Sequence, residues 1–349
     1  MTKTNTGNFF EDFRIGQELA HATPRTVTTG DVSLYTALYG TRFAMQSSDE
    51  FARAAGLARA PVDDLLVFHI VFGKTVPDVS LNAVANLGYA ECRFLAPVHP
   101  GDTLSTRSTV IGLRENANRE SGVVYVRSTG RNQDGAAVLD YVRWVMVRKR
   151  DKGAVVAPPD VPKLAPAVAA ADLALPDGLD LRAYDAALAG APHRWGDYAA
   201  GERIDHVDGM TIEEAEHMIA TRLYQNTAKV HFDQLLAAST RFGRRLIYGG
   251  HVISMARALS FNGLANAFKI AAINAGSHTN PTLAGDTIYA WSEVKEKAEI
   301  PGRGDVGALR LRTLAVKNAP AAAFPDKGAD GRTDPSVVLD LDYWALMPR

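Results

Sequence analysis

The 349-residue sequence has one cysteine, no long hydrophobic run and almost no net charge. Cys92 alone cannot form an internal disulfide or a thiolate metal cluster, and its strand-like context, YAECRFL, predicts a small buried side chain. No apolar run approaches the roughly 20 residues that span a bilayer. The start of the sequence, MTKTNTGNFFEDFRIG, lacks the apolar stretch of a secretory signal. We therefore expect a cytoplasmic protein that does not contact a membrane.

The charges exclude a further class of function. The 38 basic and 39 acidic residues give a net charge of -1 without a long run of either sign, which argues against nucleic-acid binding through bulk electrostatics. No His-x-x-x-His or Asp/His cluster has the spacing of a metal site, and no Gly-rich phosphate loop is present. We expect neither a metal nor a nucleotide cofactor.

The sequence repeats itself. The stretch FEDFRIGQELAH at 10–21 aligns with WGDYAAGERIDH at 195–206 at a constant offset of 185 residues. The same offset places Gln46 opposite His231 and Ser48 opposite Asp233. Later matches, such as GDTL with GDTI and VLDYVRW with VLDLDYW, extend the repeat to both ends. We interpret the chain as a tandem duplication, with one copy at 1–150, a Pro/Ala-rich linker at 151–193 and a second copy at 194–349.

Both copies show the same order of expected elements. A polar helix comes first, at 31–39 and at 211–224, and in the second copy Thr211 and Glu214 have the spacing of a capping box. A strongly apolar helix follows, DLLVFHIVFGKTV in the first copy and HVISMARALSFNGL in the second. In the first copy the apolar residues surround the helix, so we expect it to be buried on every side, with His69 hydrogen-bonded inside.

Strand-like runs complete each copy, and in the first copy they lie at 104–112, 122–129 and 138–147. An antiparallel sheet curled around the apolar helix supplies the environment that such a helix needs. The predicted fold class is therefore α+β, a double hotdog with two tandem units, each of them a sheet wrapped around a long central helix.

Two motifs carry a resemblance to a known family. PVHPGDTL at 97–104 and QNTAKVHFD at 225–233 resemble motifs of the MaoC-like (R)-specific enoyl-CoA hydratases, in which G-D-x-N-P-x-H-x-D precedes the turn into the central helix. The second motif keeps His231 and Asp233 but has Asn226 in place of the family aspartate. In the first copy, GTRFAMQSS at 40–48 keeps only the glycine, so we expect the first copy to hold a degenerate site and the second to carry the chemistry.

Longer stretches, including SSDEFARAAGL and VLDYVRWVMVRKRD, resemble the mesaconyl-CoA hydratases within that family. This resemblance implies reversible addition of water to a branched, carboxylated enoyl-CoA. The CoA thioester is then the substrate and not a cofactor. We also expect two chains to pair through their strands as a homodimer.

Hydration of an enoyl thioester requires a donor for the thioester oxygen, a base for water and an acid for the α-carbon. The resemblance assigns the oxyanion donor to the backbone of Gly250, and Gly249-Gly250 at a helix start offers unpaired N–H groups; a packing role for these glycines is the alternative. His231 suits proton transfer near neutral pH. Asn226 cannot act as a base, but it can position a water molecule.

A carboxylate elsewhere is the competing source of the base. Asp233 is one candidate, although it is also placed to cap the next helix. The Asp63-Asp64 pair, which we align with Gly250 and His251, is the other, although acidic residues are common at helix starts. His251 either faces the site or covers it.

Other functions remain open. The alternatives are an (R)-specific hydratase for other acyl chains, a hotdog thioesterase and a non-catalytic acyl-CoA-binding module. The basic residues Lys229, Arg244 and Arg245 flank the motif and either meet the CoA phosphates or form a solvated edge.

Overall fold

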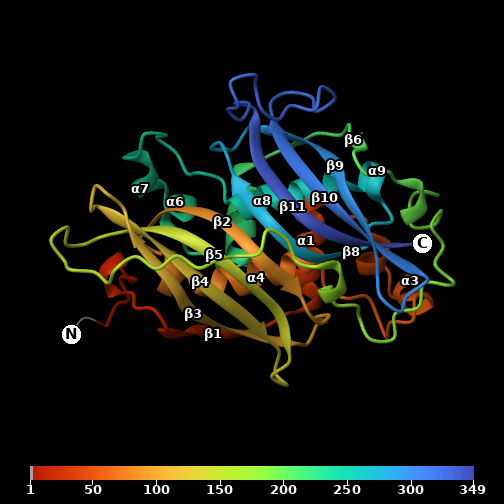
Figure 1. Cartoon of the computed structure of the whole chain (residues 1–349), viewed down its shortest axis with the longest axis horizontal. Helices are drawn as coiled ribbons and strands as arrows, with labels where there is room; N and C mark the ends of the chain where they lie inside the picture. Colours follow the sequence, from red (N-terminus) through yellow and green to blue (C-terminus); the bar gives the residue numbers. More distant parts are fainter. Residues whose placement is uncertain (1–2) are drawn as a thin grey trace.

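One antiparallel sheet of 11 strands runs through the computed structural model, which describes residues 3–349 (Figure 1). The neighbouring strands follow the order β1-β3-β4-β5-β2-β8-β11-β10-β9-β6, and β7 pairs with β9. The strands are β1 (Glu18–Thr26), β2 (Ala83–Phe94), β3 (Thr103–Glu115), β4 (Ser121–Arg131), β5 (Ala137–Arg148), β6 (Arg203–Asp205), β7 (Met210–Thr211), β8 (Lys269–His278), β9 (Thr287–Glu299), β10 (Val306–Lys317) and β11 (Val337–Pro348).

The two copies of the repeat join at the pairing of β2 with β8, where Tyr89 lies opposite Gly276 and Cys92 opposite Ile273. Cys92 is fully buried there, as the sequence predicted. The three strands predicted in the first copy are confirmed as the centres of β3, β4 and β5, and each is longer than predicted. Strands β1 to β5 and β6 to β11 thus form two halves of one continuous sheet.

The two strongly apolar helices pack against the sheet, one against each half. Helix α4 packs against β1, β3 and β5, and α8 packs against β9, β10 and β11. The helices are α1 (Thr29–Tyr39), α2 (Ala44–Ser47), α3 (Asp49–Ala54), α4 (Asp64–Thr75), α5 (Glu214–Leu223), α6 (Lys229–Phe232), α7 (Gln234–Ala238), α8 (Gly249–Leu259) and α9 (Phe261–Leu264). Short 3₁₀ or π turns are η1 (Phe10–Asp12), η2 (Val76–Ser80), η3 (Ala170–Asp172) and η4 (Trp195–Asp197). A sheet wrapped around a central helix, twice over, is the double hotdog that the sequence predicted.

The two central helices are antiparallel neighbours. His69 of α4 accepts or donates a hydrogen bond at 2.8 Å from the Ser254 hydroxyl of α8. The start of α4, at Asp63, lies near Arg257 toward the end of α8. At the other end, the ring of Phe72 lies 5.8 Å from that of Tyr248, which precedes α8. The second half of α4 therefore lies against the first turn of α8.

The short helices confirm the internal repeat. Ser48 caps α3 by accepting the N–H of Phe51, and Asp233 caps α7 by accepting the N–H of Leu236. Gln46 and His231 occupy corresponding places on α2 and α6. The offset of 185 residues between the copies thus holds for the structure as well as for the sequence.

The predicted capping box at Thr211 is wrong. Thr211 lies in β7, where its hydroxyl is 2.8 Å from that of Thr287 on β9, and α5 begins only at Glu214 without a side-chain cap. Pairing with β9 extends the backbone of Thr211, so its side chain cannot turn back onto the helix. In the first copy, Thr28 and Asp31 do form such a box at the start of α1.

Residues 151–193 contain one 3₁₀ turn and an isolated β-bridge, and they pack against both halves of the sheet. Their buried residues Leu179, Leu181 and Tyr184 join a hydrophobic cluster beneath β8, β10 and β11. The carbonyl of Val168 accepts a hydrogen bond from the Trp344 indole at 2.9 Å. We propose that the first copy ends at residue 150 and that the second begins at residue 194. Within residues 3–349, no helix is both long and apolar enough to cross a membrane.

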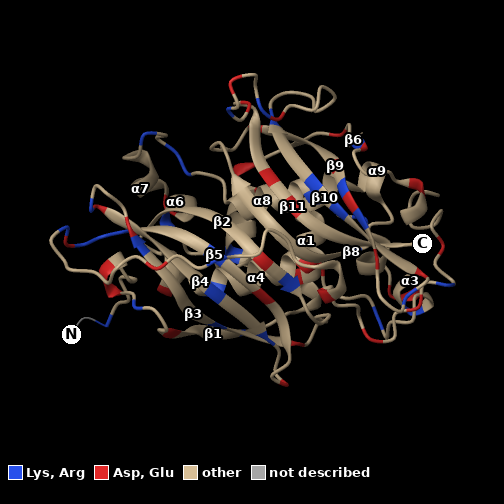
Figure 2. Cartoon of the chain, in the orientation of Figure 1, with Lys and Arg blue, Asp and Glu red and all other residues tan. Residues whose placement is uncertain are grey.

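Basic and acidic residues are interspersed along both halves of the molecule (Figure 2). On the strands they form cross-strand ion pairs, such as Arg310 with Asp342 and Arg312 with Asp340, both at 2.8 Å. The mixed pattern agrees with the small net charge.

Candidate active site

The His231 imidazole is held in one orientation on α6. Its Nδ1–H donates to the carbonyl of Leu246 at 2.8 Å, which leaves the lone pair on Nε2 free to accept a proton. The side chain is partly exposed. Burial of the ring lowers the pKa of His231 to about 4, and the bond to Leu246 offsets only part of this effect. His231 is therefore neutral at pH 7 and able to accept a proton at Nε2.

Asn226 is buried at the start of the same loop, with 1% of its surface exposed. Its Oδ1 accepts the N–H of Ala228 at 3.1 Å, and its backbone N–H donates to the carbonyl of Thr221 at 2.9 Å. A backbone N–H can bond only to the oxygen of the side-chain amide, so this contact fixes the orientation of the amide and leaves Nδ2 available as a donor.

Gln225, at the position of the family glycine, has a left-handed backbone with φ of 54°. This is the conformation in which glycine is favoured. The Gln225 side chain accepts a hydrogen bond from Lys74 of α4. Gly73 of α4 touches the loop directly, since a Cβ there would lie 1.9 Å from the carbonyl oxygen of Tyr224.

The start of α8 presents unpaired backbone donors. Gly249 and Gly250 are its first residues and have no acceptors within the helix. The N–H of Tyr248, just before them, donates to Nε2 of His217 at 2.9 Å. The ring of Tyr248 lies 5.7 Å from that of His231, so the residue that precedes the two glycines also neighbours this histidine.

Close packing accounts for both glycines. A Cβ on Gly249 would lie 2.3 Å from the imidazole of His278, and one on Gly250 would lie 2.4 Å from the ring of Tyr248 and 2.6 Å from that of His69. Neither position has room for a side chain without movement of an aromatic ring. Packing therefore requires glycine at both positions.

Sequence reasoning missed two histidines of this cluster, His217 on α5 and His278 on β8. The His217 ring lies 6.2 Å from that of His231, and burial lowers its pKa to about 2. Burial, and then the nearby His231, lower the pKa of His278 to about 4. Neither residue belongs to a recognisable motif, so no sequence signal marked them; only the fold brings them to the start of α8.

His251 faces inward. Its Nδ1 lies 2.7 Å from the Tyr39 hydroxyl, which lies 2.7 Å from the Tyr224 hydroxyl, and burial lowers the pKa of His251 to about 3. The residue thus links α8 to α1 and α5 rather than pointing at the base. His69 is fully buried and hydrogen-bonded to Ser254, as the sequence predicted.

The structure does not bring the candidate carboxylates to His231. Asp233 is exposed and caps α7. Asp63 caps α4 by accepting the N–H of Leu65 at 2.9 Å, and burial raises its pKa to about 6. Its neighbour Arg257 follows Gly250 by seven residues, about 10 Å along α8.

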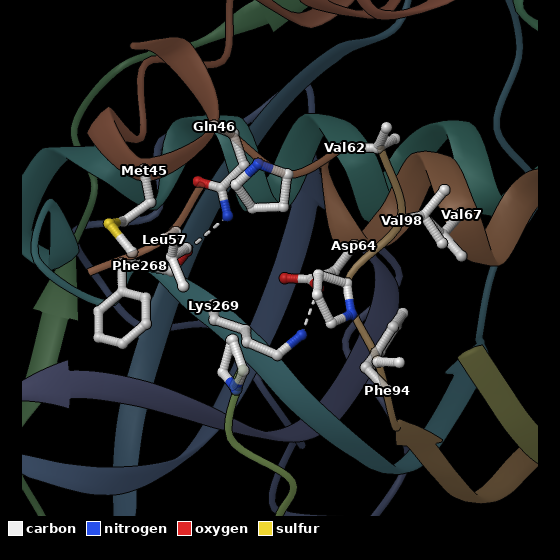
Figure 3. A pocket seen from close by; sticks show the side chains of 14 residues that line it. Met45, Gln46, Leu57, Val62, Asp64, Val67, Phe94, Val98, Phe268 and Lys269 are labelled. Atoms are coloured by element: carbon white, nitrogen blue, oxygen red, sulfur yellow. Dashed lines mark hydrogen bonds and ion pairs between the residues drawn. The ribbon is translucent and has the colours of Figure 1, made fainter. Parts of the chain in front are cut away.

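Asp64 has a structural role in a small pocket at the start of α4, which Figure 3 shows. Its carboxylate pairs with Lys269 at 2.7 Å and accepts the N–H of Ile270 at 3.0 Å. In the same pocket Gln46 donates to the carbonyl of Phe268 at 2.8 Å. This is the place in the first copy that corresponds to the His231 site in the second.

The alignment of the Asp63-Asp64 pair with Gly250 and His251 is wrong by two residues. The helix starts place Asp63 opposite Tyr248 and Asp64 opposite Gly249. The apolar sequences after the two helix starts are compatible with either alignment, whereas the N-cap residues Asp63 and Tyr248 establish which one is correct.

Of the basic residues that flank the motif, Arg245 is paired, with its guanidinium 2.9 Å from the carboxylate of Glu214. Among residues 3–349, no group of three or more His, Cys, Asp or Glu side chains is arranged to hold a metal ion. The arrangement at His231 can accept and return a proton, and the start of α8 can stabilise negative charge on an oxygen.

Comparison with known proteins gives concordant matches. A sequence model of the family of mesaconyl-CoA hydratases matches residues 1–326. The mesaconyl-CoA hydratase of Cereibacter sphaeroides is 65% identical over 347 residues, which cover 99% of this chain and 100% of that protein. The β-methylmalyl-CoA dehydratase of Chloroflexus aurantiacus is 64% identical over 347 residues, which cover 99% of each protein. A crystal structure of a MaoC domain dehydratase from Chloroflexus aurantiacus is 63% identical, with a TM-score of 0.98 over 100% of this chain and 99% of that one.

Proposed function

Because the chain belongs to the mesaconyl-CoA hydratase family, we propose that it catalyses the reversible addition of water to mesaconyl-CoA to give β-methylmalyl-CoA. It is thus a hydro-lyase. Among its structural features, the one that carries the proposal is the neutral, Nδ1-anchored His231 next to the unpaired N–H groups of Gly249 and Gly250.

Mesaconyl-CoA is a 2-methylfumaryl thioester, so its β-carbon bears the free carboxylate and its α-carbon bears the methyl group. Water held by Asn226 Nδ2 gives a proton to Nε2 of His231 while its oxygen bonds to the β-carbon. The electrons of the double bond move to the thioester oxygen, where the backbone N–H of Gly250, supported by that of Gly249, stabilises the enolate. His231 then returns the proton to the α-carbon.

A single proton carrier suits this substrate. The family aspartate would place a second negative charge beside the substrate carboxylate, and an amide at Asn226 avoids that repulsion. The bound carboxylate also favours the protonated form of His231, so it raises the pKa of this base during the reaction. The substrate thereby compensates for the low pKa that burial causes.

The reaction transfers protons and changes no oxidation state, so we propose that it needs no cofactor. We further propose that the protein works in the cytoplasm as a homodimer, assembled through strand edges of the sheet. The acyl-CoA substrate is its partner molecule.

The alternatives are less well supported. A thioesterase needs a nucleophile or a water-directing carboxylate at the carbonyl carbon, whereas the structure places Asp63, Asp64 and Asp233 in caps and ion pairs. A non-catalytic acyl-CoA-binding module has no need of an anchored histidine beside two packed glycines. An (R)-specific hydratase for other acyl chains differs only in its substrate.

The test is a pair of assays on the wild-type protein. Loss of enoyl-thioester absorbance is followed with mesaconyl-CoA and with crotonyl-CoA, and free thiol is measured in parallel. We expect rapid loss with mesaconyl-CoA, slower loss with crotonyl-CoA and no thiol release. Thiol release would indicate a thioesterase, faster loss with crotonyl-CoA would indicate the other hydratase, and no change with either would favour the binding module.

A further inference from the structure

Arg143 lies on β5 with its side chain fully buried against α4. Its guanidinium carbon is 4.2 Å above the centre of the Phe72 ring. One terminal nitrogen, Nη2, donates to the hydroxyl of Thr75 at 2.7 Å and lies 3.3 Å from that of Ser80. The guanidinium is therefore held firmly in one place by α4 and the turn that follows it.

The remaining donors of Arg143 are unused. Nε and Nη1 are buried and have no hydrogen-bond partner within residues 3–349. Its titratable neighbours are the phenols of Tyr89, Tyr141 and Tyr248, which are neutral at pH 7, and burial lowers the pKa of Arg143. The arginines of the outer sheet face differ in this respect, since Arg310 and Arg312 both pair with aspartates.

An unpaired cation in a protein interior is costly, and buried charges are normally found paired. Arginine is also the side chain best suited to a carboxylate partner, because its planar group presents several fixed donors. The Tyr141 hydroxyl next to it also lacks a partner within the described residues. The group is thus equipped for an anion that the chain itself does not supply.

Contacts between aromatic rings connect this group to the site. The Phe72 ring, on which Arg143 is stacked, lies 5.8 Å from that of Tyr248, and Tyr248 lies 5.7 Å from His231. On the other side, the Tyr89 hydroxyl is 3.3 Å from Nε2 of His278, whose ring packs on Gly249. Arg143 is therefore connected through Phe72 and Tyr248 to His231, and through Tyr89 and His278 to Gly249.

We propose that Arg143 binds the free carboxylate of the substrate. This inference rests on the proposed function, in which the carboxylate is attached to the carbon that water attacks. Pairing with Arg143 withdraws negative charge from that carbon and lowers its repulsion of the incoming oxygen. An uncharged acyl chain leaves the arginine unpaired, so the same contact selects carboxylated substrates.

The variant Arg143→Met tests the proposal. We expect kcat/KM for mesaconyl-CoA to fall about 10²-fold to 10³-fold, because a buried charge pair loses one partner. The value for crotonyl-CoA should stay the same or rise. Arg143→Lys keeps the charge without the fork of donors, and it should recover part of the loss.

Arg257→Met is the matched control. Arg257 is also buried, lies over a phenylalanine ring (Phe43, at 3.6 Å) and has an Nη1 without a partner within residues 3–349, but its charged neighbour is Asp63. Its loss should change the two substrates equally. An equal fall with both substrates in Arg143→Met would show a structural role and overturn the proposal.

A measurement on the wild type covers the case in which Arg143→Met does not fold. Succinyl-CoA carries a terminal carboxylate and butyryl-CoA does not. We expect the inhibition constant of succinyl-CoA against mesaconyl-CoA hydration to be at least about tenfold lower than that of butyryl-CoA. Equal inhibition would overturn the proposal. Failure of the proposed function is a different result, because the wild type would then not hydrate mesaconyl-CoA at all.

Discussion

Lowering the pH tests the environment of His231. A free histidine has a pKa of about 6.5, whereas burial lowers the pKa of His231 to about 4. The base must be unprotonated to accept a proton from water. The value of kcat/KM reports the ionisation of the free enzyme, so it should be constant from pH 8 down to about pH 5 and fall only at lower pH.

The difference between the two cases is large at pH 5. With a pKa of about 4, about 90% of His231 is neutral at that pH, whereas with the ordinary value only about 3% is. The expected kcat/KM at pH 5 is thus close to that at pH 7.5, and an unperturbed histidine would lower it about 30-fold. Initial rates of mesaconyl-CoA hydration in buffers of constant ionic strength measure it.

Circular dichroism at each pH is the first control, since a rate is informative only for folded protein. His278 has a similarly low pKa, so His278→Gln is the second control, and the position of the acid limb should not move in this variant. A half-loss of kcat/KM near pH 6.5, in folded protein, would refute the argument that His231 works as a desolvated, neutral base.

Two substitutions test its partners. The variant Asn226→Asp can still accept the N–H of Ala228, but it places a carboxylate beside that of the substrate. We therefore expect slower hydration of mesaconyl-CoA and a smaller effect with crotonyl-CoA. An unchanged or faster rate with mesaconyl-CoA would contradict the repulsion argument. The variant Gly250→Ala places a methyl group within 2.6 Å of Tyr248 and His69. In rate assays we expect kcat to fall about 10²-fold. In denaturant titrations we expect the free energy of unfolding to fall by about 1–3 kcal/mol. An alanine variant of full activity would place the oxyanion donor elsewhere.

The sequence predicted those features that depend on local pattern. The apolar circumference of 64–76 is enough to require burial, so the double hotdog followed without coordinates, and so did the cap at Asp233. The repeat aligned Ser48 with Asp233, but only the structure showed that Ser48 is also a cap. Family motifs then pointed to His231 and Gly250. The capping box predicted at Thr211 was wrong because strand pairing with a distant segment outweighed the local capping signal.

The rest of the site depends on contacts between residues far apart in the chain. His217 and His278 lie on α5 and β8, and each reaches the start of α8 only because the fold brings those elements together. Arg143 on β5 is brought against Phe72 of α4 in the same way. A histidine or arginine within an apolar run gives no sequence signal of what it faces. Asp63 and Asp64 show the reverse case, since local charge suggested a site and the fold uses them for a cap and an ion pair.

Replacement of the base is the most direct test of the account. The variant His231→Ala, assayed with mesaconyl-CoA beside the wild type, should lose about 10²-fold to 10⁴-fold in kcat while keeping the circular dichroism spectrum of the wild type. A folded His231→Ala protein that hydrates mesaconyl-CoA at the wild-type rate would contradict the claim that this histidine carries the proton.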